Sequence, residues 1–333
     1  MTETFKHQQF AHCESGVVST LLTAYGLPIS EPMAFGITSS LSFVYLPIVK
    51  LNSLPLIAYR QLPKNIINNI SKVLGIKIKT EKFSDPLVAN RRLTTLVEEE
   101  KKLVGLQSSV FYLPYLPEDM RFHFNAHNLL VYGKEGSEYH ISDPVLEEVV
   151  TCNEAKLSIA RFAKGAFTPK GFLYYPEEIP KDIDFHSAIK KAIKKTVKSM
   201  NSPFPYAGLK GMDRVANKIR SLKKKTSAAD KKYIKLFLTH IVRMQEEIGT
   251  GGGGFRFLYA AFLQEAKAYE LNEKILDDAA ALFIQSGDTL RTFALLCVKA
   301  SRNDKEIDFD AIADKLLEAK AHEAKAYALL KHI

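Results

Sequence analysis

Three residues of the sequence have the types that cysteine-based acyl chemistry requires: Cys13, His127 and Asp143. A thiolate attacks a carbonyl carbon, an imidazole takes the thiol proton, and a carboxylate holds the imidazole in the correct tautomer. Each residue also has an ordinary structural interpretation, namely a buried thiol, a hydrogen-bonded histidine at a strand end, and an aspartate that starts a turn before Pro144. Whether the three side chains can react together depends on the elements that position them.

Cys13 precedes a segment with the pattern of an amphipathic helix. From Ser15 onward the apolar residues recur at helical spacing, and Gly26 ends the run. Cys13 is therefore expected at or just before the first turn, where unpaired backbone N–H groups and the helix dipole favour an anion. A thiol in such a position can have its pKa lowered from about 8.5 to between about 3.5 and 7.5.

His127 and Asp143 flank the clearest hairpin pattern in the chain. Residues 128–132 and 139–142 are short β-rich runs joined by a loop that contains glycine. If this loop centres on Glu135, His127 and Asp143 lie directly opposite one another on one face of the hairpin. A register shift of one residue would place them on opposite faces.

Composition indicates an ordinary globular protein without a cofactor or metal site. The chain has 333 residues, of which 46% are hydrophobic and 25% charged, so two domains are expected. The first residues lack the apolar region of a signal peptide, and no apolar run is long enough to span a bilayer. The three cysteines are far apart, which predicts a reducing, cytoplasmic location rather than a disulfide framework. No Cys/His cluster has zinc-ligand spacing.

The spacing of apolar residues changes once along the chain, from a mixture of helical and strand-like spacing to helical spacing alone. Residues 1–176 combine helical and strand-like segments and predict an α/β (α+β) domain, and residues 176–180 read as a proline-bracketed linker. Residues 181–333 are helical almost throughout, which predicts an all-α domain. Within the first domain, residues 33–47 are expected to form a second buried helix, or one that breaks at Gly36, and Glu31 to be an acid in its first turn. In the second domain, separate helices are expected over 273–285 and 288–301.

Positive charge is concentrated in one segment. The net charge is +9, and residues 181–243 alone hold 17 basic and 4 acidic residues. Five lysines of this segment fall on one side of a single predicted helix: Lys190, Lys191, Lys194, Lys195 and Lys198. Lys223–Lys225 add a second cluster at the next helix end. Such a surface fits an acidic partner, but it lacks the interleaved aromatics typical of nucleic-acid binding, so nucleic acid is not expected.

A run of glycines, Gly249–Gly254, separates two predicted helices. It does not have the P-loop pattern, because it follows a helix and lacks the Gly-Lys-Ser/Thr ending. A tight inter-helix loop is the simpler interpretation. The alternative is a phosphate site made by the N–H groups of the following helix with help from Arg256.

Several sequence segments resemble the butirosin biosynthesis protein H family. Its N-terminal domain, which is similar to the papain-like and peptidase C39-like enzymes, is resembled by the segments HCESG, LLTAYGLPISEPMAFG, FYLP and AHNLLVYG with YHISDP. The helical domain that follows it in the family is resembled by the segment GTGGGGFRFLYAAFLQEA. The resemblance implies a papain-like fold and an acyltransferase that moves an acyl group from an acyl carrier protein to a small-molecule acceptor. It places the nucleophile, general base and orienting acid on Cys13, His127 and Asp143.

One position departs from the papain-like pattern. Those enzymes have an oxyanion-hole glutamine six residues before the cysteine, where this sequence has His7; Gln8 and Gln9 lie nearby. Two other functions stay open on the same residues. The fold also supports a cysteine peptidase, amidase or thioesterase that uses water as the acceptor, and a carrier-protein-binding module without catalysis. The acyl group, the acceptor and the oligomeric state are not specified by the sequence.

Overall fold

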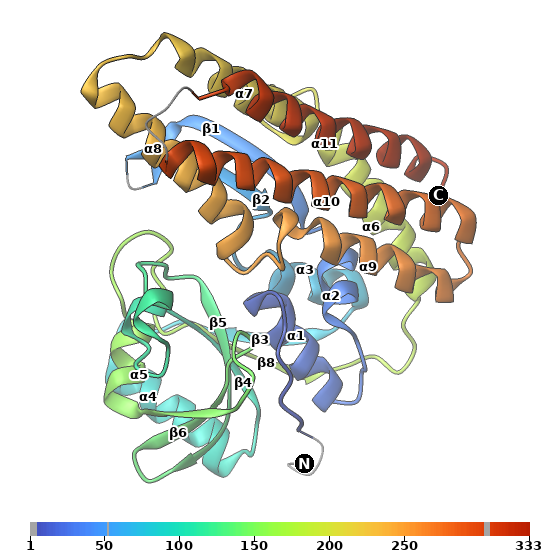
Figure 1. The fold of residues 1–333 in the computed structure, drawn as a ribbon. Helices are drawn as coiled ribbons and strands as arrows, with labels where there is room; N and C mark the ends of the chain where they lie inside the picture. The colour runs from blue at the N-terminus through green and yellow to red at the C-terminus, as the bar shows by residue number, and fades with distance from the viewer. Residues whose placement is uncertain (1–4, 52, 303–306) are drawn as a thin grey trace. The chain divides into compact units, whose positions relative to one another are not determined.

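The chain forms two compact units in the computed structural model, which describes residues 5–51, 53–302 and 307–333 (Figure 1). Residues 5–34 and 63–183 make up the first unit, and residues 35–62 and 184–333 the second. The change of unit after residue 183 lies close to the linker expected at 176–180. Residues 35–62 differ from the sequence prediction, because they fold with the helical unit rather than with the N-terminal domain.

The first unit is built on a six-stranded sheet with the order β3-β8-β4-β5-β6-β7. Its strands are β3 (Lys77–Glu81), β4 (Val104–Ser108), β5 (His127–Glu135), β6 (Glu138–Ser142), β7 (Val150–Asn153) and β8 (Leu173–Glu178). Every pairing in this sheet is antiparallel, so the unit belongs to the α+β class. Its helices are α1 (Cys13–Ala24), α3 (Asn65–Leu74), α4 (Pro86–Thr94) and α5 (Glu154–Arg161).

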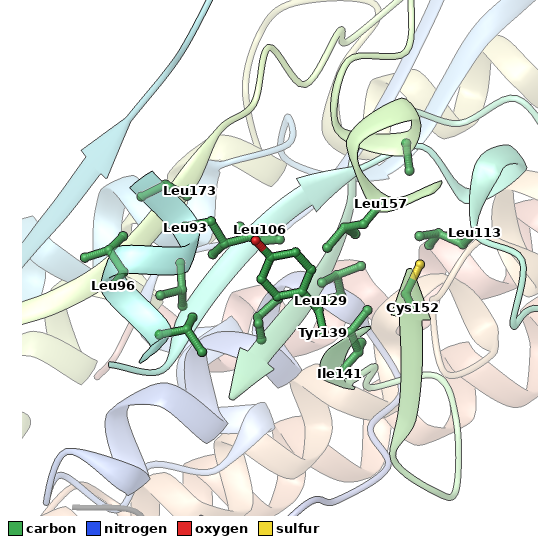
Figure 2. Close-up of a cluster of buried hydrophobic side chains, with 14 of the residues drawn as sticks. Leu93, Leu96, Leu106, Leu113, Leu129, Tyr139, Ile141, Cys152, Leu157 and Leu173 are labelled. Carbon is green, nitrogen blue, oxygen red and sulfur yellow. The ribbon is translucent and has the colours of Figure 1, made fainter. Parts of the chain in front are cut away.

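Side chains from one face of this sheet form a hydrophobic core with α4 and α5. Because side chains alternate along a strand, Leu106 of β4 and its partner Leu129 of β5 point to the same face. Figure 2 shows this cluster, whose labelled members are Leu93, Leu96, Leu106, Leu113, Leu129, Tyr139, Ile141, Cys152, Leu157 and Leu173. The adjacent residues of the same strands, including Asn128, therefore belong to the opposite face. The helix α1 contacts β4, β5 and β8, and Asn128 approaches Cys13 of that helix.

The second unit combines a β-hairpin with helices. Its strands are β1 (Leu41–Leu51) and β2 (Leu54–Arg60), and its helices are α6 (Phe185–Met200), α7 (Gly208–Ser221), α8 (Ala228–Val242), α9 (Arg256–Glu265), α10 (Glu273–Arg302) and α11 (Phe309–Leu330). A continuous helix over residues 33–47 is therefore wrong, whereas the alternative of a helix that breaks at Gly36 agrees with the structure. The helix α2 (Glu31–Ile37) ends directly after Gly36 and Ile37, and β1 begins at Leu41. The backbone N–H of Tyr45 donates to the carbonyl of Tyr206, which ties β1 to the segment before α7.

The two helices expected on either side of residues 286–287 are one continuous helix, α10. Gly287 lies inside this helix. Its lack of a side chain serves a close contact with Phe257 and Gly253 rather than a turn. A Cβ atom at Gly287 would lie 2.7 Å from the ring of Phe257, and one at Gly253 would lie 2.9 Å from the Gly287 Cα. Glycine at position 287 thus allows the glycine-rich loop to pack against α10.

Candidate active site

Cys13 is the first residue of α1, and 6% of its surface is exposed. His12 forms the N-cap, because its Nδ1 accepts a hydrogen bond from the backbone N–H of Ser15 (3.3 Å). Helix geometry leaves the N–H of Cys13 without an acceptor inside the helix, and the positive end of the helix dipole lies at this turn. The helix start agrees with the position expected for Cys13 from the sequence.

Glu31 holds the peptide that leads into Cys13. Its carboxylate accepts hydrogen bonds from the backbone N–H groups of Ala11 (3.0 Å) and His12 (2.7 Å) and from Ser15 Oγ (3.0 Å). Burial raises the pKa of Glu31, although the three hydrogen bonds act in the opposite direction. Glu31 is the first-turn acid that the sequence indicated, since it begins α2, and it also fixes the entry into α1.

Glu14 is a fully buried acid next to Cys13, and the sequence analysis assigned no role to it. Its carboxylate accepts hydrogen bonds from the backbone N–H groups of Lys64 (3.0 Å), Ile66 (2.9 Å) and Ile67 (3.4 Å) at the start of α3. The N-cap of α3, Lys64, makes no side-chain cap of its own. The carboxylate therefore replaces the missing cap and joins α1 to α3. The sequence did contain a signal for this role, because Glu14 lies at helical spacing from the apolar residues of α1 and therefore on the buried face of that helix.

His127 and Asp143 meet as the sequence predicts. Nε2 of His127 lies 2.7 Å from Oδ2 of Asp143, and both residues are buried. Asp143 also accepts hydrogen bonds from the hydroxyl of Tyr115 (2.8 Å) and the backbone N–H of Val145 (3.2 Å). These donors orient a carboxylate that is fully removed from solvent. Tyr115 was not identified from the sequence, because nothing local relates it to residue 143.

The ring of His127 is placed between Asp143 and Cys13. Burial lowers the pKa of His127, but the charge and hydrogen bond of Asp143, together with the hydrogen bond and charge of Cys13, raise it to about 10. Because Nε2 is engaged with Asp143, Nδ1 is the ring nitrogen that is left for the thiol. The structure thus brings Cys13, His127 and Asp143 together in one buried group.

The hairpin register from which the pairing of His127 with Asp143 was predicted is wrong, although the two residues do contact each other. Glu135 pairs with Glu138, so the turn centres on residues 136–137 rather than on Glu135. A register shift between Val131 and Gly133 adds a bulge to β5. Asp143 lies beyond the end of β6 and reaches His127 from there, which a simple cross-strand register does not describe.

An N-terminal strap, residues 7–10, ties the segment around Asp143 to the start of α1. Nδ1 of His7 lies 2.7 Å from Ser142 Oγ, Gln9 Nε2 donates to the carbonyl of Val145 (3.3 Å), and the N–H of Phe10 donates to the carbonyl of Pro144 (2.7 Å). Gln8 and Gln9 are exposed. The strap therefore positions Asp143, and the amide of Gln9 is used for this contact.

Gly16 allows the strap and Pro144 to approach α1. A Cβ atom at this position would lie 2.8 Å from Phe10 Cβ and 2.9 Å from Pro144 Cβ. We expect Gly16→Ala to lower the free energy of unfolding by about 1–3 kcal/mol, because a methyl group is added to a filled site. The displaced Pro144 would also move Asp143 and lower the reactivity of the Cys13 thiol. Chemical denaturation and intact-mass measurement of alkylation by iodoacetamide test the two effects.

A suitable control is Thr20→Ala, one turn later in α1, which adds no atom. Its hydroxyl donates to the carbonyl of Gly16 in the same helix (3.0 Å). We expect a change of less than about 0.5 kcal/mol in the free energy of unfolding for this variant. A Gly16→Ala protein as stable and as reactive as the unmodified chain would contradict the role of this close contact.

Asn128 is a further residue beside Cys13 that the sequence analysis did not identify. Its Nδ2 lies 4.0 Å from Cys13 Sγ, and 1% of its surface is exposed. Tyr174 donates a hydrogen bond from its hydroxyl to Asn128 Oδ1 (3.2 Å). The sequence indicated a role for Asn128 only through its position directly after His127.

The contacts of the glycine-rich loop favour a packing role over the phosphate-binding alternative. The N–H of Gly252 donates to Thr250 Oγ1 (3.1 Å), and the N–H of Gly253 donates to the carboxylate of Glu246 (3.1 Å). A phosphate would meet occupied donors and a negative charge in this place. The run Gly249–Gly254 therefore serves the close contacts of the second unit.

Arg256 is also unavailable to a phosphate. It is fully buried, and its Nε donates to Glu323 Oε1 of α11 (3.0 Å) while its Nη1 donates to the carbonyl of Gly254 (2.7 Å). Ser286 of α10 donates to the same carboxylate (3.1 Å). The pair thus joins α9, α10 and α11 in the core of the second unit.

Of the three free cysteines, Cys152 and Cys297 are poor candidates for chemistry. Both are buried; burial raises the pKa of the Cys152 thiol to about 12 and raises that of Cys297 further. Over residues 5–51, 53–302 and 307–333, no group of three or more His, Cys, Asp and Glu side chains is arranged to hold a metal ion. Within the same residues, no helix has both the length and the apolar character that crossing a membrane requires.

Two family models match the chain. Residues 12–144, which include Cys13, His127 and Asp143, match the model described as butirosin biosynthesis protein H, N-terminal. Residues 155–330 match a domain of unknown function, DUF4872. No curated protein matches the chain. The two matches together cover most of the sequence and meet near the start of α5.

Proposed function

Because the chain belongs to the family that joins the butirosin biosynthesis protein H N-terminal domain to a DUF4872 domain, we propose that it is a cysteine-dependent acyltransferase of natural-product biosynthesis. It takes an acyl group from the thioester of an acyl carrier protein and transfers it to an amine or hydroxyl acceptor. The family name refers to the biosynthesis of an antibiotic, which supports this biological setting. Cys13, His127 and Asp143 carry the chemistry.

The contact that carries the proposal is the 2.7 Å hydrogen bond between His127 and Asp143 beside a cysteine at a helix start. Asp143 fixes the ring so that Nδ1 faces the thiol, and its charge favours the imidazolium. The helix start favours the thiolate. A helix led by the nucleophile and packed on an antiparallel sheet that carries the histidine is the arrangement of papain-like enzymes, and we assign the first unit to that class.

The proposed reaction has two steps, acylation of Cys13 and transfer of the acyl group to the acceptor. In both steps His127 carries the proton that is exchanged. The Cys13 thiol gives its proton to Nδ1, and the thiolate forms a C–S bond with the thioester carbonyl carbon. The tetrahedral adduct collapses, the bond to the carrier's thiol breaks, and His127 returns the proton to that leaving group. The acceptor then attacks the acyl–Cys13 thioester and gives its proton to His127. Collapse of this second adduct releases the product and the Cys13 thiolate.

Intact-mass spectrometry of the protein mixed with acylated carrier proteins tests the proposal. The expected result is an added acyl mass that peptide mapping places on Cys13, followed by its loss as an amide or ester when an acceptor is added. Release of free acid without an acceptor would indicate a thioesterase or amidase instead. Carrier binding without any acyl mass on Cys13 would indicate a non-catalytic binding module.

Exposed lysines on α6 support an acidic carrier protein as the donor. Four of them are exposed and a fifth is half-buried, and the helix has no acidic residue: Lys190, Lys191, Lys194, Lys195 and Lys198. The second predicted cluster is partly neutralised, because Lys223 pairs with Asp310 and Lys225 with Asp230. We therefore assign carrier docking to α6 rather than to the end of α7.

If α6 steers the carrier, acyl transfer from the carrier falls steeply with added salt, because salt screens exposed charges beyond about 10 Å at 0.1 M. Transfer from a small thioester responds little. Reversal of Lys191, Lys194 and Lys198 to Glu should lower kcat/KM for the carrier by at least about tenfold and leave the small thioester unchanged. Initial rates with both donors measure the effect.

The matched control reverses three exposed lysines elsewhere in the second unit, Lys299, Lys325 and Lys331, with the same change in net charge. This variant should retain the rate with the carrier to within about threefold. Equal losses in the two variants would show that net charge, rather than α6, governs the encounter.

A further inference from the structure

The side-chain amide of Asn128 is aimed at the sulfur of Cys13 from the neighbouring strand. Its Nδ2 lies 4.0 Å from Cys13 Sγ, and both residues are buried. Asn128 follows His127 directly on β5, on the face of the sheet that α1 contacts. A fixed N–H donor at this distance from a nucleophilic sulfur can reach an oxygen that is bound to the attacked carbon.

Two contacts fix the orientation of this amide. The hydroxyl of Tyr174 donates to Asn128 Oδ1 (3.2 Å), and Asn128 Nδ2 donates to the carbonyl of Ala126 (3.2 Å). The second contact distinguishes the nitrogen from the oxygen, because a backbone carbonyl only accepts hydrogen bonds, whereas a phenol can donate or accept. The same contact uses one of the two amide hydrogens and leaves the other for the side of Cys13.

A glycine on the adjacent strand permits this arrangement. A Cβ atom at Gly105 of β4 would lie 2.4 Å from the ring of Tyr174. The ring therefore passes directly over the Gly105 backbone, where no other residue type fits without displacement. Gly105, Tyr174 and Asn128 thus form a chain of contacts, built from three strands, that ends at the nucleophile.

Three donors near the start of α1 are committed elsewhere. Glu31 accepts the N–H groups of Ala11 and His12, and Gln9 donates to the carbonyl of Val145. The N–H of Cys13 has no acceptor within the helix. Stabilisation of an oxyanion by acyl-transfer enzymes uses two or more such donors, so a second one is required beside the N–H of Cys13.

We propose that Asn128 Nδ2 and the backbone N–H of Cys13 form the oxyanion hole, an inference that rests on the proposed acyl chemistry at Cys13. When the thiolate forms the C–S bond, the carbonyl π electrons move onto oxygen, and this oxygen accepts hydrogen bonds from the two groups. The same bonds are lost when the adduct collapses, the C=O bond re-forms and the leaving group departs. Asn128 is thereby a catalytic residue, and Tyr174 is a positioning residue.

Two reactions of Cys13 separate this role from a structural one. Acylation by p-nitrophenyl acetate passes through an oxyanion and releases nitrophenolate, whereas alkylation by iodoacetamide displaces iodide and forms no oxyanion. Asn128→Ala should slow acylation by about 10²–10³-fold and alkylation by less than about threefold. Stopped-flow absorbance and intact mass follow the two reactions on the full chain.

Three further variants keep the test decisive. The double variant Asn128→Leu with Tyr174→Phe removes the amide and the hydroxyl together, so that the Ala126 carbonyl is the group that loses its donor. This costs less folding free energy than removing the amide alone, which also leaves the Tyr174 hydroxyl unpaired, and the variant should lose acylation as Asn128→Ala does. Tyr174→Phe alone keeps the amide and should lose about three- to tenfold. Asn90→Ala truncates another buried asparagine, whose Oδ1 accepts from Arg161, and should acylate at the unmodified rate.

The outcomes distinguish this inference from the proposed function. An activated ester needs no carrier, so acylation that depends on Asn128 supports the oxyanion hole even if no carrier-bound acyl group is transferred. Equal losses in acylation and alkylation would overturn it, because the residue would then act on the thiol alone. Acylation of the Asn128 variants at the unmodified rate, or failure of the ester to acylate the unmodified protein, would overturn it as well.

Discussion

Replacement of Cys13 by alanine is expected to lower acyl transfer by about 10⁴-fold or more while leaving the fold intact. In the proposed reaction Cys13 is the nucleophile of the buried group that includes His127 and Asp143, so its loss would remove the covalent intermediate. The small side chain is tolerated because Cys13 begins α1, where alanine keeps the helical backbone. Steady-state rates with an acylated carrier and with a small thioester measure the loss, and circular dichroism follows the fold.

Cys152→Ala is the matched control for this prediction. Cys152 is also a free, buried cysteine of the first unit, but it belongs to the hydrophobic core shown in Figure 2. Its removal should lower the free energy of unfolding by about 1 kcal/mol, because a small cavity is left, and should retain the acyl-transfer rate. A Cys13→Ala protein that still forms an acyl-enzyme would show that another residue is the nucleophile.

Asp143→Asn is expected to lower acyl transfer at pH 7 by about 10²–10⁴-fold and to move its alkaline limit to lower pH. In the unmodified protein the pKa of His127 is about 10, because the charge and hydrogen bond of Asp143 and the contact with Cys13 outweigh burial. Without that charge, burial pulls the pKa of His127 down from its raised value. The imidazolium that protonates the leaving thiol is then lost at lower pH. Plots of kcat/KM against pH for both proteins measure the shift.

The same pair makes a prediction about stability. Because the pKa of His127 rises from an ordinary value of 6.5 to about 10 in the folded protein, its contribution is fully present below pH 6.5. It is lost as the pH rises through about 10. The unmodified protein should therefore lose unfolding free energy over this range, and Asp143→Asn should lose much less. Denaturant unfolding at pH 6, 8 and 10 tests this difference.

Asp119→Asn is the control, since Asp119 is an exposed carboxylate in the short 3₁₀ helix Glu118–Met120 and undergoes the same chemical change. Its pH profiles of activity and stability should match those of the unmodified protein. Identical pH profiles for Asp143→Asn and the unmodified protein would contradict the assigned role of Asp143.

Local features of the first unit were predictable because short-range patterns determine them. The apolar spacing after Ser15 and the position of Gly26 predicted the helix that Cys13 begins, and β-rich runs predicted both strands of the hairpin. The residue types of Cys13, His127 and Asp143 indicated acyl chemistry before any geometry was known. Likewise, the spacing of the α6 lysines along one helix face follows from the helical period alone.

Element boundaries failed where packing overrode local signals. Residues 41–47, the second half of the segment expected to be a buried helix or one that breaks at Gly36, lie in β1 instead. Pairing with β2 and the contact with Tyr206 satisfy their backbone groups. Gly287 read as a helix break but lies inside α10, because the loop at Gly253 packs against it. Both positions depend on partners distant in the sequence, and periodicity within one segment contains no information about them.

The sequence alone determined which residues could do chemistry and which local element each belongs to. The tertiary structure alone decided how they meet. Three features bring the carboxylate of Asp143 into hydrogen-bond contact with His127. They are the observed hairpin register, the approach of Asp143 from beyond the end of β6, and the close packing of the N-terminal strap against Gly16. The Tyr174–Asn128 contact, which aims an amide at Cys13, likewise joins separate strands. Such contacts join residues tens to more than a hundred positions apart, and their geometry depends on the simultaneous packing of several elements, which no local pattern encodes.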